Sequence, residues 1–128
     1  MREAAVQQRV QLEMARRQCL IWRNNSGACE DKNGRVIRYG LGHTSAQQVR
    51  SWASSDLIGI VPVTIQPYHV GQVFGLFTAI EVKEPGWHLT PGDQRAQAQL
   101  RFLELVRSVG GIASFVTDPA QVDGIIRR

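Results

Sequence analysis

The sequence contains little cysteine and no long apolar run. Cys19 and Cys29 are the two cysteines among 128 residues, too few for a disulfide-stapled secreted scaffold, so free thiols in a reducing compartment are expected. No apolar run approaches the ~20 residues needed to cross a bilayer. The first ten residues include Glu3 and glutamines where a signal peptide needs an apolar core. These absences predict a cytoplasmic protein that does not enter a membrane.

The sequence also lacks low-complexity tracts, obvious repeats and blocks of like charge, as ordinary globular proteins do. Its length suits one domain with a sizeable core, so residues 1–128 are expected to form a single domain. The formal charge of +4 and the pI near 9.7 favour a polyanionic partner, although many unrelated proteins carry such a charge.

Helical and strand-like patterns alternate along the chain. Apolar residues recur at helical spacing in residues 2–18, 93–109 and 118–128, with a short helical turn expected in residues 44–54. Strand-like runs occupy residues 19–24, 35–40, 56–65, 74–83 and 112–117. This order predicts an α/β or α+β domain in which helices flank a mixed central sheet.

Turn and capping residues punctuate these elements. Asn33-Gly34 predicts a tight turn, after which residues 35–40 return as a strand beside residues 19–24. Asp93 can cap the long helix and Gly110-Gly111 can end it. The apolar face of this helix is expected to contain Leu100, Leu103 and Val106, with Phe102 and Val109 as further candidates.

Two opposite charges, Glu81 and Lys83, interrupt the end of an apolar strand. Residues i and i+2 of a strand point to the same side, so the two side chains are expected to emerge together. A hairpin centred on residues 68–71, with Ile65 opposite Phe74, places Asp56 opposite Lys83. Glu81 is then the diagonal neighbour of Asp56, at roughly 7–8 Å between Cα atoms. A slip of one residue would send Asp56 to the other face.

Two carboxylates without a cysteine or histidine cluster suit a hard cation, Mg²⁺ or Mn²⁺, which prefers oxygen ligands. Lys83 beside such an ion can hold a phosphate oxygen or steer a water toward phosphorus. An ion pair at a strand end is the commoner reading of an isolated E-x-K. The upstream Asp56 favours the metal site instead.

The spacing Asp56…Glu81-Val82-Lys83 resembles the signature of PD-(D/E)xK nucleases. More narrowly, the chain resembles a stand-alone VRR-NUC domain, a virus-type replication-repair nuclease. The shared stretches, in order, are "WRNNSGA" (22–28), "YGLG" (39–42), "SSDLIGI" (54–60), "AIEVK" (79–83) and "QLRFLELVRSVGG" (99–111). The resemblance implies a restriction-endonuclease-like fold and divalent-metal-dependent cleavage of DNA. Two departures are Ser54-Ser55 before the acid and the long connection from Asp56 to Glu81.

The resemblance also implies roles for individual residues. Asp56, Glu81 and the Val82 carbonyl would bind the metal, and Lys83 would act on the attacking water. Glu3 and Gln99 would complete the site, with Glu13 as the rival of Glu3 for the helix acid. Small family members are similar to Holliday junction resolvases, which implies a homodimer acting on DNA, branched DNA included, in a bacterial or phage-infected bacterial cell. The rival interpretation is a catalytically weak or inactive DNA-binding module on a nuclease-like fold.

Several further residues have two interpretations. Arg23, Asn25 and the backbone at Gly27 form a turn that suits a phosphate, and solvated loop residues are the equal alternative. Without the resemblance, Gln99 would be interpreted as structural because it lies near the apolar face of its helix. The three tryptophans are expected in the core or an interface rather than as base-stacking platforms, although Trp87, next to the active-site loop, is a candidate for base stacking.

Overall fold

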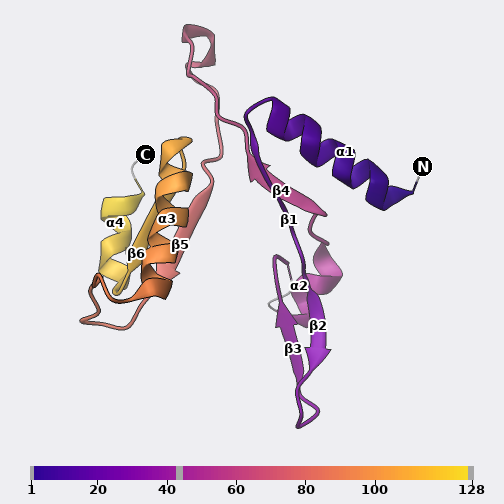
Figure 1. The fold of residues 1–128 in the computed structure, drawn as a ribbon, viewed down its shortest axis with the longest axis vertical. Coiled ribbons are helices and arrows are strands. Elements are labelled where there is room, and N and C mark those ends of the chain that lie inside the picture. The colour runs from indigo at the N-terminus through magenta and orange to yellow at the C-terminus, as the bar shows by residue number, and fades with distance from the viewer. Residues whose placement is uncertain (1, 43–44, 127–128) are drawn as a thin grey trace. The chain divides into compact units, whose positions relative to one another are not determined.

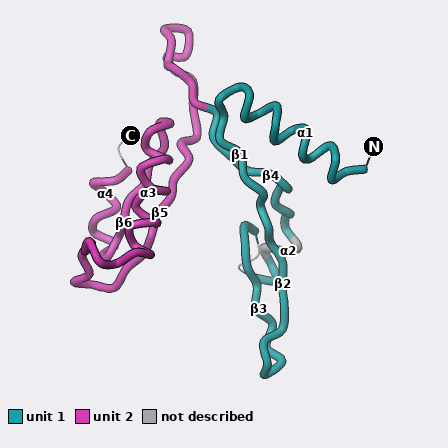
Figure 2. Tube along the Cα trace, in the orientation of Figure 1, with its two compact units in different colours: residues 1–61 teal, residues 62–128 magenta. Residues whose placement is uncertain are grey.

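The computed structural model describes residues 2–42 and 45–126, which form short strands and helices of a mixed α and β class, as expected (Figure 1). The chain divides into two compact units, Met1–Val61 and Pro62–Arg128 (Figure 2). No helix in the described ranges combines the length and apolar character needed to span a membrane.

The first unit joins one helix to two antiparallel strand pairs and a short second helix. Its elements are α1 (Glu3–Arg16), β1 (Leu20–Arg23), β2 (Gly27–Glu30), β3 (Val36–Tyr39), α2 (Ala46–Ser51) and β4 (Leu57–Ile60). β1 pairs with β4, so that Trp22 lies opposite Ile58 and Arg23 opposite Leu57. β2 pairs with β3 as a hairpin. The β1–β4 pair positions the segment that contains Asp56.

The predicted return of residues 35–40 beside residues 19–24 is wrong. The Asn33-Gly34 turn does form, but the strand that it joins to β3 is β2. The residues of β2 were expected to lie in a loop. The carboxylate of Asp31 explains this local hairpin, because Oδ1 accepts the backbone N–H groups of Asn33 at 2.8 Å and Arg35 at 2.9 Å. Such an Asx-type turn reverses the chain within a few residues.

The second unit is built on a β-α-β crossover. Its elements are β5 (Thr78–Val82), α3 (Gln94–Ser108), β6 (Ile112–Val116) and α4 (Val122–Ile125), with 3₁₀ turns at Pro67–His69 and Pro119–Gln121. β5 and β6 are parallel, and Glu81 lies opposite Phe115. α3 supplies the long connection that a parallel pair requires.

α3 matches its prediction closely. Asp93 caps it, because its Oδ1 accepts the Ala96 N–H at 2.9 Å, and the helix ends at Ser108 before the two glycines. Leu103 and Val106 are buried as expected, together with Ala96 and with Ala113 and Val116 of β6, whereas Phe102 is 41% exposed. This packed face fixes the position of α3 against the strand pair.

The hairpin predicted between residues 56–65 and 74–83 is wrong. β4 pairs with β1 and β5 pairs with β6, and neither Ile65 nor Phe74 lies in a strand. Pro62 lacks an N–H donor for a ladder, and the turn near His69 is closed locally by its own ring, whose Nδ1 accepts the Gln66 N–H. The described strands therefore form three two-stranded sheets, not the single central sheet expected. The register no longer supports a shared face for Asp56 and Lys83.

Candidate functional site

Glu81 and Lys83 lie on the same side of β5, as predicted. Ala79 and Glu81 are half-buried on the side of α3, whereas Ile80 and Val82 on the opposite side are exposed. Lys83 directly follows the strand, and its backbone N–H extends the ladder by donating to the Val116 carbonyl at 2.9 Å. The strand end is therefore held firmly where the two charges emerge.

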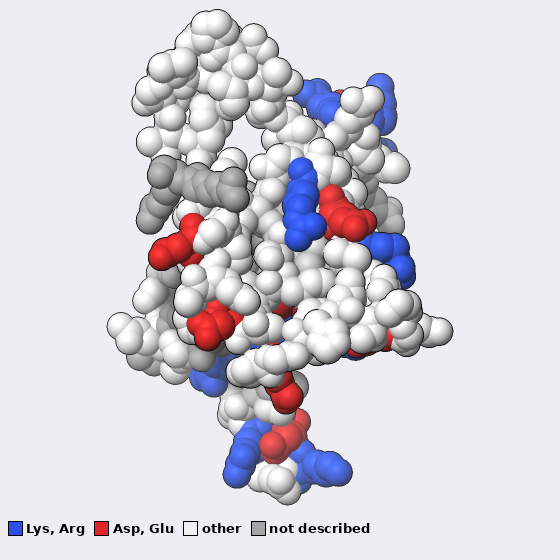
Figure 3. Space-filling model, turned by 90° about the vertical axis from the view of Figure 1, so that its left-hand side faces the viewer, with Lys and Arg blue, Asp and Glu red and all other residues white. Residues whose placement is uncertain are grey.

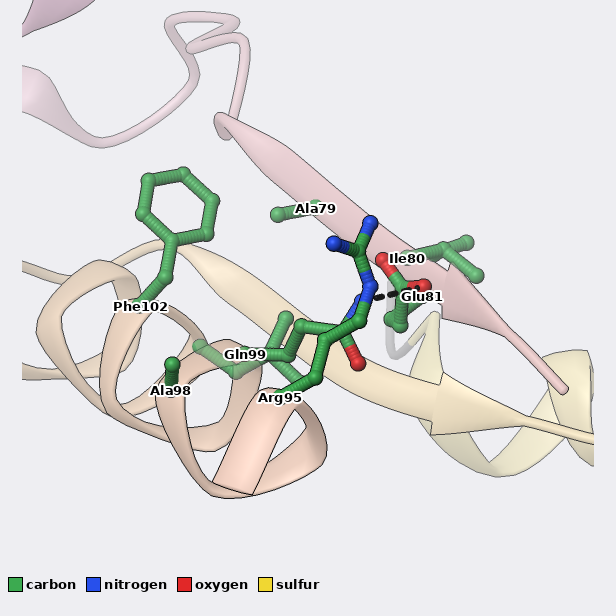
Figure 4. Close-up of a pocket in the computed structure, with 8 residues that line it drawn as sticks. Ala79, Ile80, Glu81, Arg95, Ala98, Gln99 and Phe102 are labelled. Carbon is green, nitrogen blue, oxygen red and sulfur yellow. Dashed lines mark hydrogen bonds between the residues drawn. The ribbon is translucent and has the colours of Figure 1, made fainter. Parts of the chain in front are cut away.

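Gln99 of α3 joins the two charged side chains. Its Nε2 donates to Glu81 Oε1 at 2.9 Å (Figure 4). Its Oε1 accepts from Lys83 Nζ at 2.8 Å. Lys83 Nζ also lies 3.7 Å from Glu81 Oε1. Of the two ways in which the amide group can be turned, only this one directs its N–H at the carboxylate and its oxygen at the ammonium. Gln99 thus fixes both charges at once.

One carboxylate oxygen of Glu81 remains available. Its Oε1 takes part in the network, whereas Oε2 has no hydrogen-bond or ion-pair partner among the described residues. The side chain is 37% exposed, so a ligand can reach it from solvent. A free carboxylate oxygen is the donor that Mg²⁺ or Mn²⁺ takes.

The Val82 carbonyl is placed for the same use. A parallel ladder engages the N–H and C=O groups of alternate residues. Phe77 and Lys83 make such bonds with β6, through the Phe77 carbonyl and the Lys83 N–H. The backbone groups of Val82 therefore point toward the other edge of β5, along which no strand pairs in the described part of the chain. Carboxylate and carbonyl oxygens together fit the hard cation expected from the sequence.

A pocket of about 370 Å³ adjoins this carboxylate, between β5 and α3 (Figure 4). Glu81, Gln99 and Arg95 supply its polar wall, and the remaining lining is apolar, from Ala79, Ile80, Ala98, Phe102 and Leu103. Its size falls within the range of small-ligand sites. The pocket presents a cationic side chain and a carboxylate to the same space, which suits a phosphate group accompanied by a metal ion.

Asp56 is exposed in the first unit, just before β4. Asn24 holds its backbone: the Asp56 carbonyl accepts the Asn24 N–H at 2.8 Å, and Asn24 Nδ2 donates to the Ser55 carbonyl at 2.8 Å. Two stretches that the resemblance depends on, residues 22–28 and 54–60, are thereby brought together. The supporting role of Asn24 was not predicted.

The remaining predicted residues also lie in the first unit. Glu3 is exposed in the first turn of α1, without a partner in the described ranges, whereas Glu13 is paired with Arg16 and Arg17 at 3.0 Å each. The geometry therefore favours Glu3 over Glu13 as an acid free to bind a ligand. The exposed side chains of Arg23 and Asn25 lie just before the start of β2 at Gly27. Their contacts with phosphates remain predictions.

The structure thus divides the predicted residues between the units. Glu81, Val82, Lys83 and Gln99 come together in the second unit, and the others belong to the first. Within the described residues, no cluster of three or more His, Cys, Asp or Glu is formed. Charge is also unevenly distributed along the chain: residues 57–80 contain no Asp, Glu, Lys or Arg. The loop at the top of Figure 3 accordingly shows no charged side chain.

Comparisons with protein-family models, curated proteins and solved structures found no match. The functional interpretation therefore depends on the site itself and on the motifs that the sequence contains.

Proposed function

We propose that the protein is a Mg²⁺-dependent endonuclease that hydrolyses phosphodiester bonds in DNA, with Mn²⁺ able to substitute. The observation that supports this most is the Glu81–Gln99–Lys83 network at the end of β5. It places an available carboxylate oxygen beside an oriented ammonium, and these groups can hold a metal ion and a phosphate oxygen at a scissile bond.

Each residue has a defined task in this proposal. Glu81 Oε2 and the Val82 carbonyl would hold the ion, and the family resemblance implies Asp56 as a further ligand. The bound ion would polarise the phosphate and lower the pKa of a water. Lys83 donates to a phosphate oxygen or to the attacking water, and Gln99 keeps it directed there. The products are a 5′-phosphate and a 3′-hydroxyl, as the family resemblance implies.

DNA binding follows from the charge and the pocket. Arg95 lies in the pocket beside Glu81, where it can pair with the phosphate next to the scissile one. Arg23 and Asn25 contact the backbone further along the strand. Contacts to phosphates give an affinity that falls steeply with salt and depends little on sequence. A two-fold homodimer would present two such sites to a four-way junction, which has matching symmetry.

Cleavage of an end-labelled four-way junction and a matched linear duplex, with Mg²⁺ and with chelator, tests the proposal. Lys83→Ala is the decisive variant, and Lys32→Ala is its matched control, because Lys32 is exposed in the β2–β3 turn and is the other lysine of the chain. Metal-dependent cutting that survives in Lys32→Ala and disappears in Lys83→Ala supports the nuclease. Equal cutting of both DNAs would remove the junction preference alone. Tight binding without cutting in either metal would leave the inactive DNA-binding module.

A further inference from the structure

Two aromatic rings flank the ammonium of Lys83. Its Nζ lies 5.4 Å from the centroid of the Trp87 ring and 6.0 Å from that of Phe115. The two rings contact each other, with centroids 4.7 Å apart and planes tilted by 44°. These distances are within the reach of cation–π attraction.

The two rings reach Lys83 by different routes. Phe115 is the cross-strand neighbour of Glu81 on β6. Trp87 is brought back by a turn that begins one residue after Lys83. The Trp87 N–H donates to the Glu84 carbonyl at 3.1 Å, and Gly86 has a φ of +84°. Pro85 followed by Gly86 at positive φ is the pattern of a type II turn, so the sequence after the strand is built to fold Trp87 over it.

The Lys83 ammonium also has polar neighbours. Gln99 accepts one N–H of the ammonium, and the Glu81 carboxylate lies beyond it. The side chain is only 19% exposed, although a lysine has a long flexible stem that normally samples many rotamers. With the amide on one side and the two rings on another, the ammonium can point its remaining N–H groups in few directions.

We infer that Trp87, with Phe115 behind it, is a positioning residue that holds the Lys83 ammonium at the site, an inference that rests on the proposed nuclease function. Trp87 touches neither the metal ligands nor the DNA in this role. It acts by restricting Lys83 before substrate arrives, so its removal slows the cleavage step and leaves DNA affinity unchanged.

The contact can be measured without any activity. The chain has two lysines, so protein labelled with ¹³C at the lysine ε-carbon gives two ε-methylene signals, and Lys32→Ala identifies them. The Lys83 ε-methylene protons are expected upfield of the Lys32 protons because the adjoining Nζ lies 5.4 Å from the Trp87 ring centroid and 6.0 Å from that of Phe115. Trp87→Leu should move them to the Lys32 position, and Trp87→Phe should preserve part of the shift. An unshifted Lys83 signal in the wild type overturns the inference.

Single-turnover cleavage tests the consequence. Trp87→Leu should lower the rate about tenfold with unchanged junction affinity, Trp87→Phe should restore most of the rate, and Trp52→Leu, an exposed tryptophan of the first unit, should behave as wild type. A shifted Lys83 signal together with a wild-type rate in Trp87→Leu would show a contact that positions nothing, which overturns the inference. Absence of cleavage by the wild type would instead overturn the nuclease itself, and the positioning role with it, while the NMR signal still reports the contact.

Discussion

Gly86→Ala should be costly although it causes no clash. A Cβ at Gly86 would meet no heavy atom within 4 Å, yet the residue has a φ of +84°. A side chain in that conformation costs roughly 1–2 kcal/mol. Replacing glycine also restricts the unfolded chain, which stabilises the fold by about 0.4–1 kcal/mol wherever the native φ is ordinary. The two effects oppose each other at this position.

Gly92→Ala isolates the strain. Gly92 lies in the same connection between β5 and α3, also has no heavy atom within 4 Å of the added Cβ, and has an ordinary φ. The gain from the unfolded chain is common to both variants, so the difference between them should be the strain alone, about 1–2 kcal/mol. Urea denaturation of both variants measures it.

The same substitution should also affect the site. If the turn relaxes to relieve the strain, Trp87 leaves Lys83, and Gly86→Ala should show the NMR and cleavage changes expected of Trp87→Leu. Equal stability of the Gly86 and Gly92 variants would refute the reasoning about the turn, because their surroundings differ in backbone conformation and not in space.

Three other substitutions have defined outcomes. Gln99→Ala removes hydrogen bonds to two charged groups and should slow single-turnover cleavage ten- to hundredfold, about 1.5–3 kcal/mol. The control Gln97→Ala loses one exposed hydrogen bond and should cleave at the wild-type rate. Equal rates in the two variants would contradict the bridging role of Gln99. Leu103 is 2% exposed, so Leu103→Ala should lower the free energy of unfolding, measured by urea denaturation, by about 2–5 kcal/mol. Leu105 is 41% exposed, and Leu105→Ala should lower it by less than ~1 kcal/mol. Asp93→Ala should cost about 1 kcal/mol by loss of the α3 cap, and an unchanged midpoint would show that the cap contributes nothing.

Local signals in the sequence were reliable because they act over a few residues. Asp93 and the two glycines after α3 predict the bounds of that helix closely, and the Asn33-Gly34 turn forms. Glu81 and Lys83 also emerge on one side of β5 as their spacing requires. Each of these outcomes depends on backbone geometry that neighbouring residues determine among themselves.

Strand partners could not be predicted in this way. An apolar run specifies which side of a strand is buried, but not which other strand it pairs with. In sequence, β5 is separated from its partner β6 by the whole of α3, and β4 is separated from its partner β1 by β2, β3 and α2. The predicted hairpin joined the two runs that are adjacent in sequence, and the turn near His69 does not extend into a ladder.

The site was predicted in part. Without a family resemblance, Gln99 would have been assigned to packing, because a single sequence does not show that an amide on α3 faces two charges on β5. Trp87 was expected in the core or an interface, with its position after the active-site strand noted. The Pro85-Gly86 pair was a usable signal for its contact, since a type II turn returns the chain toward the residue before it.

The uncharged residues 57–80, which run from the end of the first unit into the second, have a practical consequence for dissecting the protein. No lysine or arginine lies between Arg50 and Lys83, so trypsin has no cleavage site there. Tyr68 is 72% exposed and Phe74 is 42% exposed, and exposed backbone with little regular structure is the preferred target of proteases. Brief digestion with chymotrypsin should therefore release two fragments, one ending and one beginning near these aromatic residues, and the fragment with β5, α3 and β6 would retain the Glu81–Gln99–Lys83 network for study on its own.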